Sequence, residues 1–204
     1  MQLILATHNE HKRREFARLL AGSGGGEAAA PHEGAGYELA LLPASVRLPP
    51  ELGETFAQNA LAKARAAAQA TGAVSFADDS GITTAALGGA PGVRSARYAG
   101  EHATDEQNLA KLLREVPAGS ALEYVCAIAC VDPVRGAEEL FEGRCLGRLA
   151  AAPRGEGGFG YDPAFIPDDG PPGLTMAQLT DAQKDAISHR GRALRALLRW
   201  LTAG

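Results

Sequence analysis

The pattern of apolar and polar residues at the start of the chain predicts a strand, a loop and a helix in succession. Residues 3–6 form a short apolar run, and from Lys12 onward apolar side chains recur at helical spacing. The next strand is expected over 38–42. The glycine- and alanine-rich stretch between these elements, residues 22–36, is expected to form a flexible surface loop.

Residues that cap helices mark where further helices begin and end. A run with apolar side chains on one side lies between Thr55 and Gly72, which predicts a helix that Thr55 begins and Gly72 stops. Thr104 and Gln107 form a capping-box pattern for a helix that reaches Leu113. Further helix starts are expected at Thr180 and Ser188.

Apolar runs predict the remaining strands. Residues 74–77 are expected to form a buried strand that leads into Asp78–Gly81, with a second short strand from Ile82. The runs 124–131 and 138–147 flank the turn sequence Asp-Pro-Val-Arg-Gly, which predicts a hairpin. Helices that alternate with strands, followed by a hairpin, predict an α/β fold with a mixed sheet.

The composition is that of an ordinary globular chain. It has 204 residues, 46% hydrophobic and 22% charged, which predicts a single domain over residues 1–204. A formal net charge of -4 argues against a protein that binds nucleic acid by neutralising many phosphates. No apolar run resembles a signal peptide or a membrane span, so a cytoplasmic location is expected. The three cysteines lack zinc-site spacing and are expected to be reduced and buried.

The stretch Thr7–Lys12 lies where a strand passes into a helix. Free backbone N–H groups and the helix dipole favour an anion there, and Lys12 adds a positive charge. The alternative is a polar turn with a solvated lysine. Asn59 and Lys63 are four residues apart and share one face of the predicted helix, so they either point into a cleft or lie on a solvated surface.

Asp78 and Asp79 follow the apolar strand directly. Two adjacent carboxylates repel each other unless a cation or a proton neutralises them, and Mg²⁺ commonly joins one or two carboxylates to substrate phosphates. Glu51 or Glu54, before the predicted helix, could supply another carboxylate. The alternative is an aspartate-rich turn that caps local N–H groups.

Two further segments could contact a nucleotide base. The glycine-rich loop 155–160 continues into Tyr161-Asp162, and it combines close backbone approach with aromatic rings that can stack. Lys184, His189 and Arg190 place donors near the start of the last helix. Paired arginine donors suit the O6 and N7 atoms of a 6-oxo purine, whereas adenine offers a donor at the 6-position. A basic helix end on the surface is the alternative.

Six segments in order carry a family resemblance: LATHNEHKRREF, ELGETFAQNALAKA, FADDSGI, LGGAPGVRSARYAG, GEGGFGYDPAF and LTDAQKDAISHRGRAL. Together they resemble the inosine triphosphate pyrophosphatase family, the dITP/XTP pyrophosphatases that clear deaminated purine nucleotides. The resemblance covers nearly the whole chain. It implies an elongated mixed sheet with flanking helices, two lobes around a central nucleotide-binding cleft, and a homodimer.

The resemblance also implies roles for individual residues. Glu51 and Asp79 would bind Mg²⁺, and Asp79 would be the catalytic proton acceptor. Thr7, Asn9 and Lys12 would hold the triphosphate, with Lys63 near it as a further cation. His189 and Arg190 would read the 6-oxo edge. The substrate-binding residues expected in all are Thr7, His8, Asn9, Glu10, His11, Lys12, Lys63, Ser80, Phe159, Gly160, Tyr161, Asp162, Lys184, His189 and Arg190, with Arg97 as a lesser candidate.

The chain departs from the family pattern at His8, where many members have glycine, and in the longer stretch 22–36. Two other functions remain as alternatives. One is a pyrophosphatase of the septum-inhibitor type, which prefers pyrimidine or modified nucleotides and which the Ser188–Arg190 segment argues against. The other is a non-catalytic nucleotide sensor, in which the carboxylates would be structural.

Overall fold

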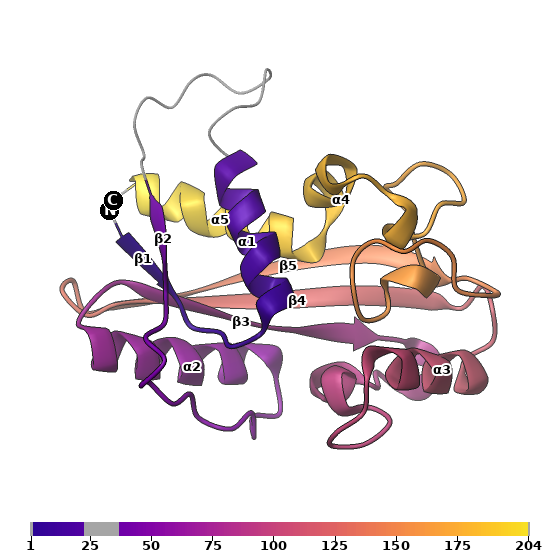
Figure 1. Cartoon of the computed structure of the whole chain (residues 1–204), viewed down its shortest axis with the longest axis horizontal. Helices are drawn as coiled ribbons and strands as arrows, with labels where there is room; N and C mark the ends of the chain where they lie inside the picture. The colour runs from indigo at the N-terminus through magenta and orange to yellow at the C-terminus, as the bar shows by residue number, and fades with distance from the viewer. Residues whose placement is uncertain (1, 23–36, 204) are drawn as a thin grey trace. The chain divides into compact units, whose positions relative to one another are not determined.

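The computed structural model describes residues 2–22 and 37–203 (Figure 1). Its strands are β1 (Gln2–Leu5), β2 (Glu38–Leu41), β3 (Ser75–Thr83), β4 (Ala121–Asp132), β5 (Ala137–Leu149) and β6 (Phe165–Pro167). Its α-helices are α1 (Glu10–Gly22), α2 (Phe56–Thr71), α3 (Asp105–Glu115), α4 (Asp181–Ile187) and α5 (His189–Ala203). Short 3₁₀ helices are η1 (Ala85–Leu87), η2 (Gly92–Arg97), η3 (Asp162–Ala164) and η4 (Met176–Gln178). The loop predicted over 22–36 lies, apart from Gly22, outside the described residues.

The strands form one six-stranded sheet in the order β2-β1-β3-β4-β5-β6. Strand β1 pairs in parallel with β2 and β3, whereas β5 and β6 are antiparallel. Strands β4 and β5 are neighbours joined by a turn in which Asp132 Oδ1 accepts from the backbone N–H groups of Val134 and Arg135. The sheet is therefore mixed, and both the α/β class and the hairpin are confirmed.

The predicted helix boundaries follow from capping groups. Thr55 closes a capping box with Gln58 at the start of α2, and Gly72 adopts φ 65 at its end. The same threonine–glutamine box begins three further helices: Thr104/Gln107 before α3, Thr175/Gln178 before η4 and Thr180/Gln183 before α4. At the start of α5, Ser188 Oγ accepts from the N–H of Gly191 at 3.0 Å. The predicted helix starts at Thr55, Thr104, Thr180 and Ser188 are confirmed.

The prediction for the stretch around Asp78–Gly81 is wrong, because these residues lie inside the continuous strand β3 rather than in a break between two strands. Partners on other elements explain the difference. Successive side chains of a strand point to opposite faces, and each aspartate meets a polar group there. Gly81 has no side chain, so η2 can approach until Ser95 Oγ accepts from the N–H of Ile82 at 2.9 Å.

The described chain divides into two compact units. The first consists of Met1–Asp79, Ala127–Glu142 and Ala193–Gly204, and the second of Ser80–Cys126 and Gly143–Arg192. Strands β3, β4 and β5 and helix α5 each contribute residues to both units. The prediction of a single domain stays a prediction.

The first unit has helices on both faces of its strands. The alanines of α2 pack with Ala77, Ala129 and Val131 on one face. Phe16 of α1 meets the neighbouring residue Phe76 edge to face, with ring centroids 5.5 Å apart. Because Phe76 and Ala77 point in opposite directions, α1 and α2 cover opposite faces of β3 (Figure 1).

The second unit has its own apolar core. It joins Ile82 of β3, Leu112 of α3, Tyr124 of β4 and Phe165 of β6, among others. The three cysteines of the chain, Cys126, Cys130 and Cys145, are free and buried, as predicted. Over the described residues, no helix has the length and apolar character needed to cross a bilayer.

Candidate active site

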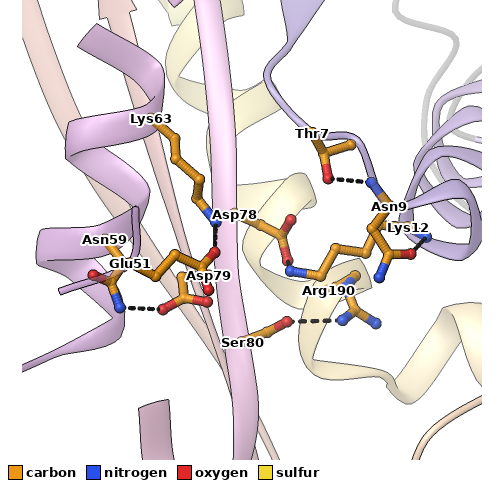
Figure 2. A network of polar contacts seen from close by, with 10 residues as sticks. All are labelled: Thr7, Asn9, Lys12, Glu51, Asn59, Lys63, Asp78, Asp79, Ser80 and Arg190. Atoms are coloured by element: carbon orange, nitrogen blue, oxygen red, sulfur yellow. Dashed lines mark hydrogen bonds and ion pairs between the residues drawn. The ribbon is translucent and has the colours of Figure 1, made fainter. Parts of the chain in front are cut away.

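Asp78 and Asp79 of β3 are buried and point toward different helices of the first unit. Asp78 Oδ2 pairs with Nζ of Lys12 on α1 at 2.9 Å. Asp79 Oδ2 accepts from Nδ2 of Asn59 on α2 at 2.8 Å (Figure 2). The two carboxylates are therefore separated by the alternation of the strand, and each has a polar partner.

Asn59 and Lys63 connect the segment before α2 with Asp79. Asn59 Oδ1 accepts from the N–H of Gly53 at 2.7 Å while its Nδ2 donates to Asp79. One turn further along α2, Lys63 Nζ pairs with Glu51 Oε1 at 2.5 Å. Lys63 is only 7% exposed, so the surface alternative for this lysine is wrong. Glu54 is exposed at the start of the helix.

Burial and neighbouring charges act together on Asp79 and Lys63. The pKa of Asp79 is raised, first by burial and also by the negative charge of Glu51, although Lys63, Lys12 and the Asn59 hydrogen bond oppose this. For Lys63, burial lowers the pKa, but Asp78, Glu51 and Asp79 outweigh it and the net pKa is raised. Lys63 therefore stays charged, while Asp79 takes up a proton more readily than an exposed aspartate.

These carboxylates fit a divalent cation that prefers oxygen ligands. Glu51 and Asp79 are close enough to influence each other electrostatically, and both interact with the charge of Lys63. Within 2–22 and 37–203, no group of three or more His, Cys, Asp or Glu side chains could hold a metal. Mg²⁺ commonly uses one or two carboxylates and completes its shell with water and phosphate oxygens, so two carboxylates suffice.

The stretch from Thr7 to Lys12 folds into the beginning of α1. Thr7 Oγ1 accepts from the N–H of Asn9 at 3.2 Å, and Asn9 Oδ1 accepts from the N–H of Lys12 at 3.0 Å (Figure 2). Asn9 therefore caps the helix. Glu10 forms ion pairs with Arg13 and Arg14 one turn along the helix, at 3.0 and 3.4 Å. The side chains of His8 and His11 are exposed.

In the second unit, Asp162 is the centre of a buried network. Its Oδ2 accepts from Lys184 Nζ at 2.7 Å and from the N–H of Phe159 at 2.9 Å. Its Oδ1 accepts from the hydroxyl of Tyr124 at 3.0 Å. A Cβ on Gly158, which has φ +70, would lie 2.1 Å from Asp162 Oδ2, so only glycine allows this approach. The carboxylate thus holds the glycine-rich loop and Lys184 together.

His189 and Arg190 are buried at the start of α5, 3% and 5% exposed. The alternative of a surface helix end is therefore wrong. The His189 ring stacks on Tyr124, with centroids 4.6 Å apart and planes 3° from parallel. Arg190 Nη2 donates to Ser80 Oγ at 2.7 Å (Figure 2), and its guanidinium carbon lies 5.1 Å from the Phe159 ring centroid.

Three other predicted residues have packing partners in this unit. Tyr161 is buried in the core, where its hydroxyl donates to the carbonyl of Ser95 at 2.7 Å. The N–H of Gly160 donates to Asp105 Oδ2 at 2.8 Å. Arg97 pairs with Glu101 at 3.8 Å.

Each unit thus brings part of the predicted set together. The first gathers Thr7, Asn9, Lys12, Glu51, Lys63 and Asp79, and the second gathers Ser80, Phe159, Asp162, Lys184, His189 and Arg190. Strand β3 joins the sets covalently, since Asp79 ends one and Ser80 begins the other. Tyr124 belongs to the second network but to no predicted motif. Its place in the apolar run 124–131 predicted only a strand, because the partner of its hydroxyl, Asp162, lies 38 residues further along the chain.

The sequence model of the Ham1 family matches residues 3–200, nearly the whole chain. The chain belongs to the Ham1 family. The relatives of this Ham1 family member include a dITP/XTP pyrophosphatase of Mycolicibacterium paratuberculosis, 48% identical over 96% of the chain and 93% of the relative. A dITP/XTP pyrophosphatase of Symbiobacterium thermophilum is 47% identical, covering 99% of the chain and 95% of the relative.

A solved structure agrees with this assignment. The HAM1 protein from Coxiella burnetii superposes with a TM-score of 0.83 at 37% sequence identity, and the match covers 100% of both chains. The family that the sequence motifs indicated is therefore confirmed, and so is its mixed α/β fold.

Proposed function

We propose that this Ham1 family member hydrolyses non-standard purine nucleoside triphosphates, namely ITP, dITP and XTP, to the monophosphate and pyrophosphate. The names of its relatives support the substrate class. The observation that carries the proposal is the buried Asp79 carboxylate, which Asn59 ties to the segment bearing Glu51, opposite two lysines. Lys12 is paired with Asp78 and Lys63 with Glu51, and these pairs together with the buried Asp79 form a charged cluster that suits a polyanion bound with a divalent cation.

The triphosphate is assigned to residues of the first unit. Lys12 and Lys63 supply two positive charges, and the start of α1 adds backbone N–H groups and the positive end of the helix dipole. Thr7 and Asn9 order this helix start through their own hydrogen bonds. Glu10 is engaged with Arg13 and Arg14, which offsets its repulsion of phosphate.

Mg²⁺ is assigned to Glu51 and Asp79. When bound there, it supplies positive charge that stabilises phosphate oxygens and lowers the pKa of a nearby water. The ion pair between Glu51 and Lys63 at 2.5 Å holds the Glu51 carboxylate close to α2. Lys63 thereby balances negative charge that would otherwise accumulate around Asp79.

Asp79 is assigned as the proton acceptor. A water attacks the α-phosphorus, its proton passes to the Asp79 carboxylate, and the bond between the α-phosphorus and the bridging oxygen breaks to release pyrophosphate. Burial and the charge of Glu51 raise the pKa of Asp79 in the protein alone, and Mg²⁺ bound beside this carboxylate would oppose that shift. Asn59, which donates to Oδ2, fixes the direction of the accepting group.

The base is assigned to residues of the second unit. Phe159 offers an aromatic face beside the cations of Lys184 and Arg190. Arg190 is rigidly placed by its bond to Ser80 and presents donors that suit the O6 of hypoxanthine or xanthine, whereas the amino group of adenine would oppose them. The homodimer stays a prediction from the family resemblance, and the cytoplasmic location stays a prediction from the apolar pattern of the sequence.

A substrate panel tests the proposal directly. ITP, dITP, XTP, GTP and ATP are incubated with the protein and Mg²⁺, and pyrophosphate is distinguished from orthophosphate. We expect pyrophosphate from ITP and XTP with kcat/KM at least about tenfold above that for ATP, the scale of one lost bidentate contact. Adding excess EDTA should stop the release.

The other outcomes identify the rivals. A preference for pyrimidine or modified nucleotides would favour the septum-inhibitor type of pyrophosphatase. Tight binding of ITP without any release of pyrophosphate would favour the nucleotide sensor. Orthophosphate as the first product would contradict attack at the α-phosphorus.

A further inference from the structure

Tyr124 lies on β4, outside all the sequence motifs, and contacts two of the residues assigned to the base. Its hydroxyl donates to Asp162 Oδ1 at 3.0 Å, and its ring stacks on His189. The side chain is 6% exposed. Tyr124 is therefore shielded from solvent and acts on its neighbours rather than on bulk water.

The hydroxyl of Tyr124 fixes the orientation of the Asp162 carboxylate. Asp162 has one oxygen on Tyr124 and the other on Lys184 and on the backbone of Phe159. With both oxygens engaged, the carboxylate has a single orientation, and that orientation directs the Lys184 ammonium. Buried polar networks of this kind lose order when one member is removed.

The ring of Tyr124 controls His189. A nearly parallel stack at 4.6 Å restricts the imidazole to one plane, and Phe165 supports the tyrosine ring at 4.6 Å with a tilt of 42°. His189 is the first residue of α5 and directly precedes Arg190. The plane of the imidazole at this helix start is thus set from β4.

We infer that Tyr124 is a positioning residue for purine recognition, which orients His189 through its ring and Lys184 through Asp162. The inference rests on the proposed function, since it assigns specificity to the same base-binding residues. Tyr124 acts without touching the substrate. Loss of Tyr124 lowers the selectivity among purine bases more than it lowers the affinity for the phosphates.

The test separates the hydroxyl from the ring. Tyr124→Phe removes only the hydrogen bond to Asp162, and Tyr124→Leu also removes the stack. We expect the ratio of kcat/KM for ITP over ATP to fall about three- to tenfold in Tyr124→Phe, the fold-change of one ordinary hydrogen bond. It should fall further in Tyr124→Leu, by about another two- to tenfold, the worth of an aromatic pair.

Tyr98→Phe is the matched control, because the Tyr98 hydroxyl also donates to a carboxylate, that of Glu115, in the same unit. It should leave the ITP/ATP ratio unchanged. Arg190→Ala is the positive reference and should lower the ratio by about five- to a hundredfold. Thermal unfolding of all variants records structural damage separately.

Inhibition by products gives a second readout. IMP inhibition should weaken in both Tyr124 variants, whereas inhibition by pyrophosphate should stay within about twofold of wild type, since no base contact is involved. Equal weakening of both would show a merely structural role. If Tyr124→Leu fails to fold, the isosteric Tyr124→Phe decides alone.

The inference and the proposed function fail in different ways. A wild-type protein that prefers ITP, together with Tyr124 variants that keep its ITP/ATP ratio, would overturn the inference alone. A wild-type protein that releases no pyrophosphate, or releases it equally from ITP and ATP, would overturn the proposed function and the inference with it.

Discussion

The carboxylate of Asp79, which we propose as the proton acceptor, is buried inside strand β3. It is 5% exposed, and burial raises the pKa of its carboxyl group, so its ionised form is disfavoured in the folded protein. Asn59, Lys63 and Lys12 compensate for part of this effect. A residue chosen for stability alone would carry no charge at this position.

We therefore predict that Asp79→Asn lowers activity and maintains or raises stability. The kcat for ITP should fall at least about a hundredfold, the lower range for loss of a positioned proton acceptor. The melting temperature near pH 7 should equal or exceed that of wild type, because a disfavoured buried charge is removed. Steady-state kinetics and thermal unfolding measure the two effects on the same preparation.

The pH dependence of the melting temperature tests whether the buried charge of Asp79 causes this difference in stability. The folded pKa of Asp79 lies above its ordinary value of 3.8, so the wild-type protein loses relative stability as pH rises through 3.8 toward the folded pKa. Below that window the carboxyl is protonated in both the folded and the unfolded state, and the stability advantage of Asp79→Asn should vanish.

The control for activity is Asp168→Asn, which changes an exposed carboxylate that pairs with Arg148 and should leave activity unchanged. Unchanged activity in Asp79→Asn would remove this residue from the mechanism.

At the scale of elements, Gly81 decides how strand β3 meets η2. A Cβ at this position would lie 2.3 Å from Ser95 Oγ and 2.6 Å from the carbonyl oxygen of Gly92. The second contact is with backbone, so a side-chain rotation cannot relieve it. Ser95 also bonds to Ile82 and to Tyr161, so a shift of η2 would disturb the strand and the core together.

Gly81→Ala should therefore destabilise the protein by about 1–3 kcal/mol, the range for overpacking. At about 2–4 °C per kcal/mol for a chain of this size, the melting temperature should fall measurably. Gly22→Ala is the matched control, since no described atom lies within 4 Å of an added Cβ there. Equal melting temperatures for the two variants would show that β3 and η2 can separate freely.

The elements that the sequence predicted well are those whose signals are local. A threonine and a glutamine three residues apart define a helix start without reference to the rest of the chain, as at Thr104 before α3. The sequence predicted that the strand ends before Asp78, because the groups that stabilise the two aspartates lie far away in the sequence. Lys12 is 66 residues from Asp78, and Asn59 is 20 residues from Asp79. The role of Tyr124 could not be predicted for the same reason, since its partners are distant in sequence. The charged site residues could be predicted because charged side chains are rare within apolar segments.

At the scale of the whole molecule, four elements belong to both compact units. Strands β3, β4 and β5 and helix α5 each pass from one unit to the other without a linker. Two of these strands contribute side chains to both apolar cores: β3 through Ala77 and Ile82, and β4 through Ala129 and Tyr124. Unfolding of one unit would therefore disorder strands that continue into the other unit.

We predict that the chain unfolds in one cooperative transition. Ile4→Val in the first core and Ile82→Val in the second should each cost about 0.5–1.5 kcal/mol and lower the same melting temperature. Calorimetric and van't Hoff enthalpies should agree for the wild type and for both variants. A second transition that only one of the variants moves would show that the units unfold independently.

The threonine–glutamine boxes that begin α2, α3, η4 and α4 share one further property. Each is closed by the amide of Gln58, Gln107, Gln178 or Gln183, where glutamate would make the same bond. An amide neither titrates nor adds a negative charge. These capping boxes consequently persist at acidic pH as they do at neutral pH, and they do not repel a polyanion.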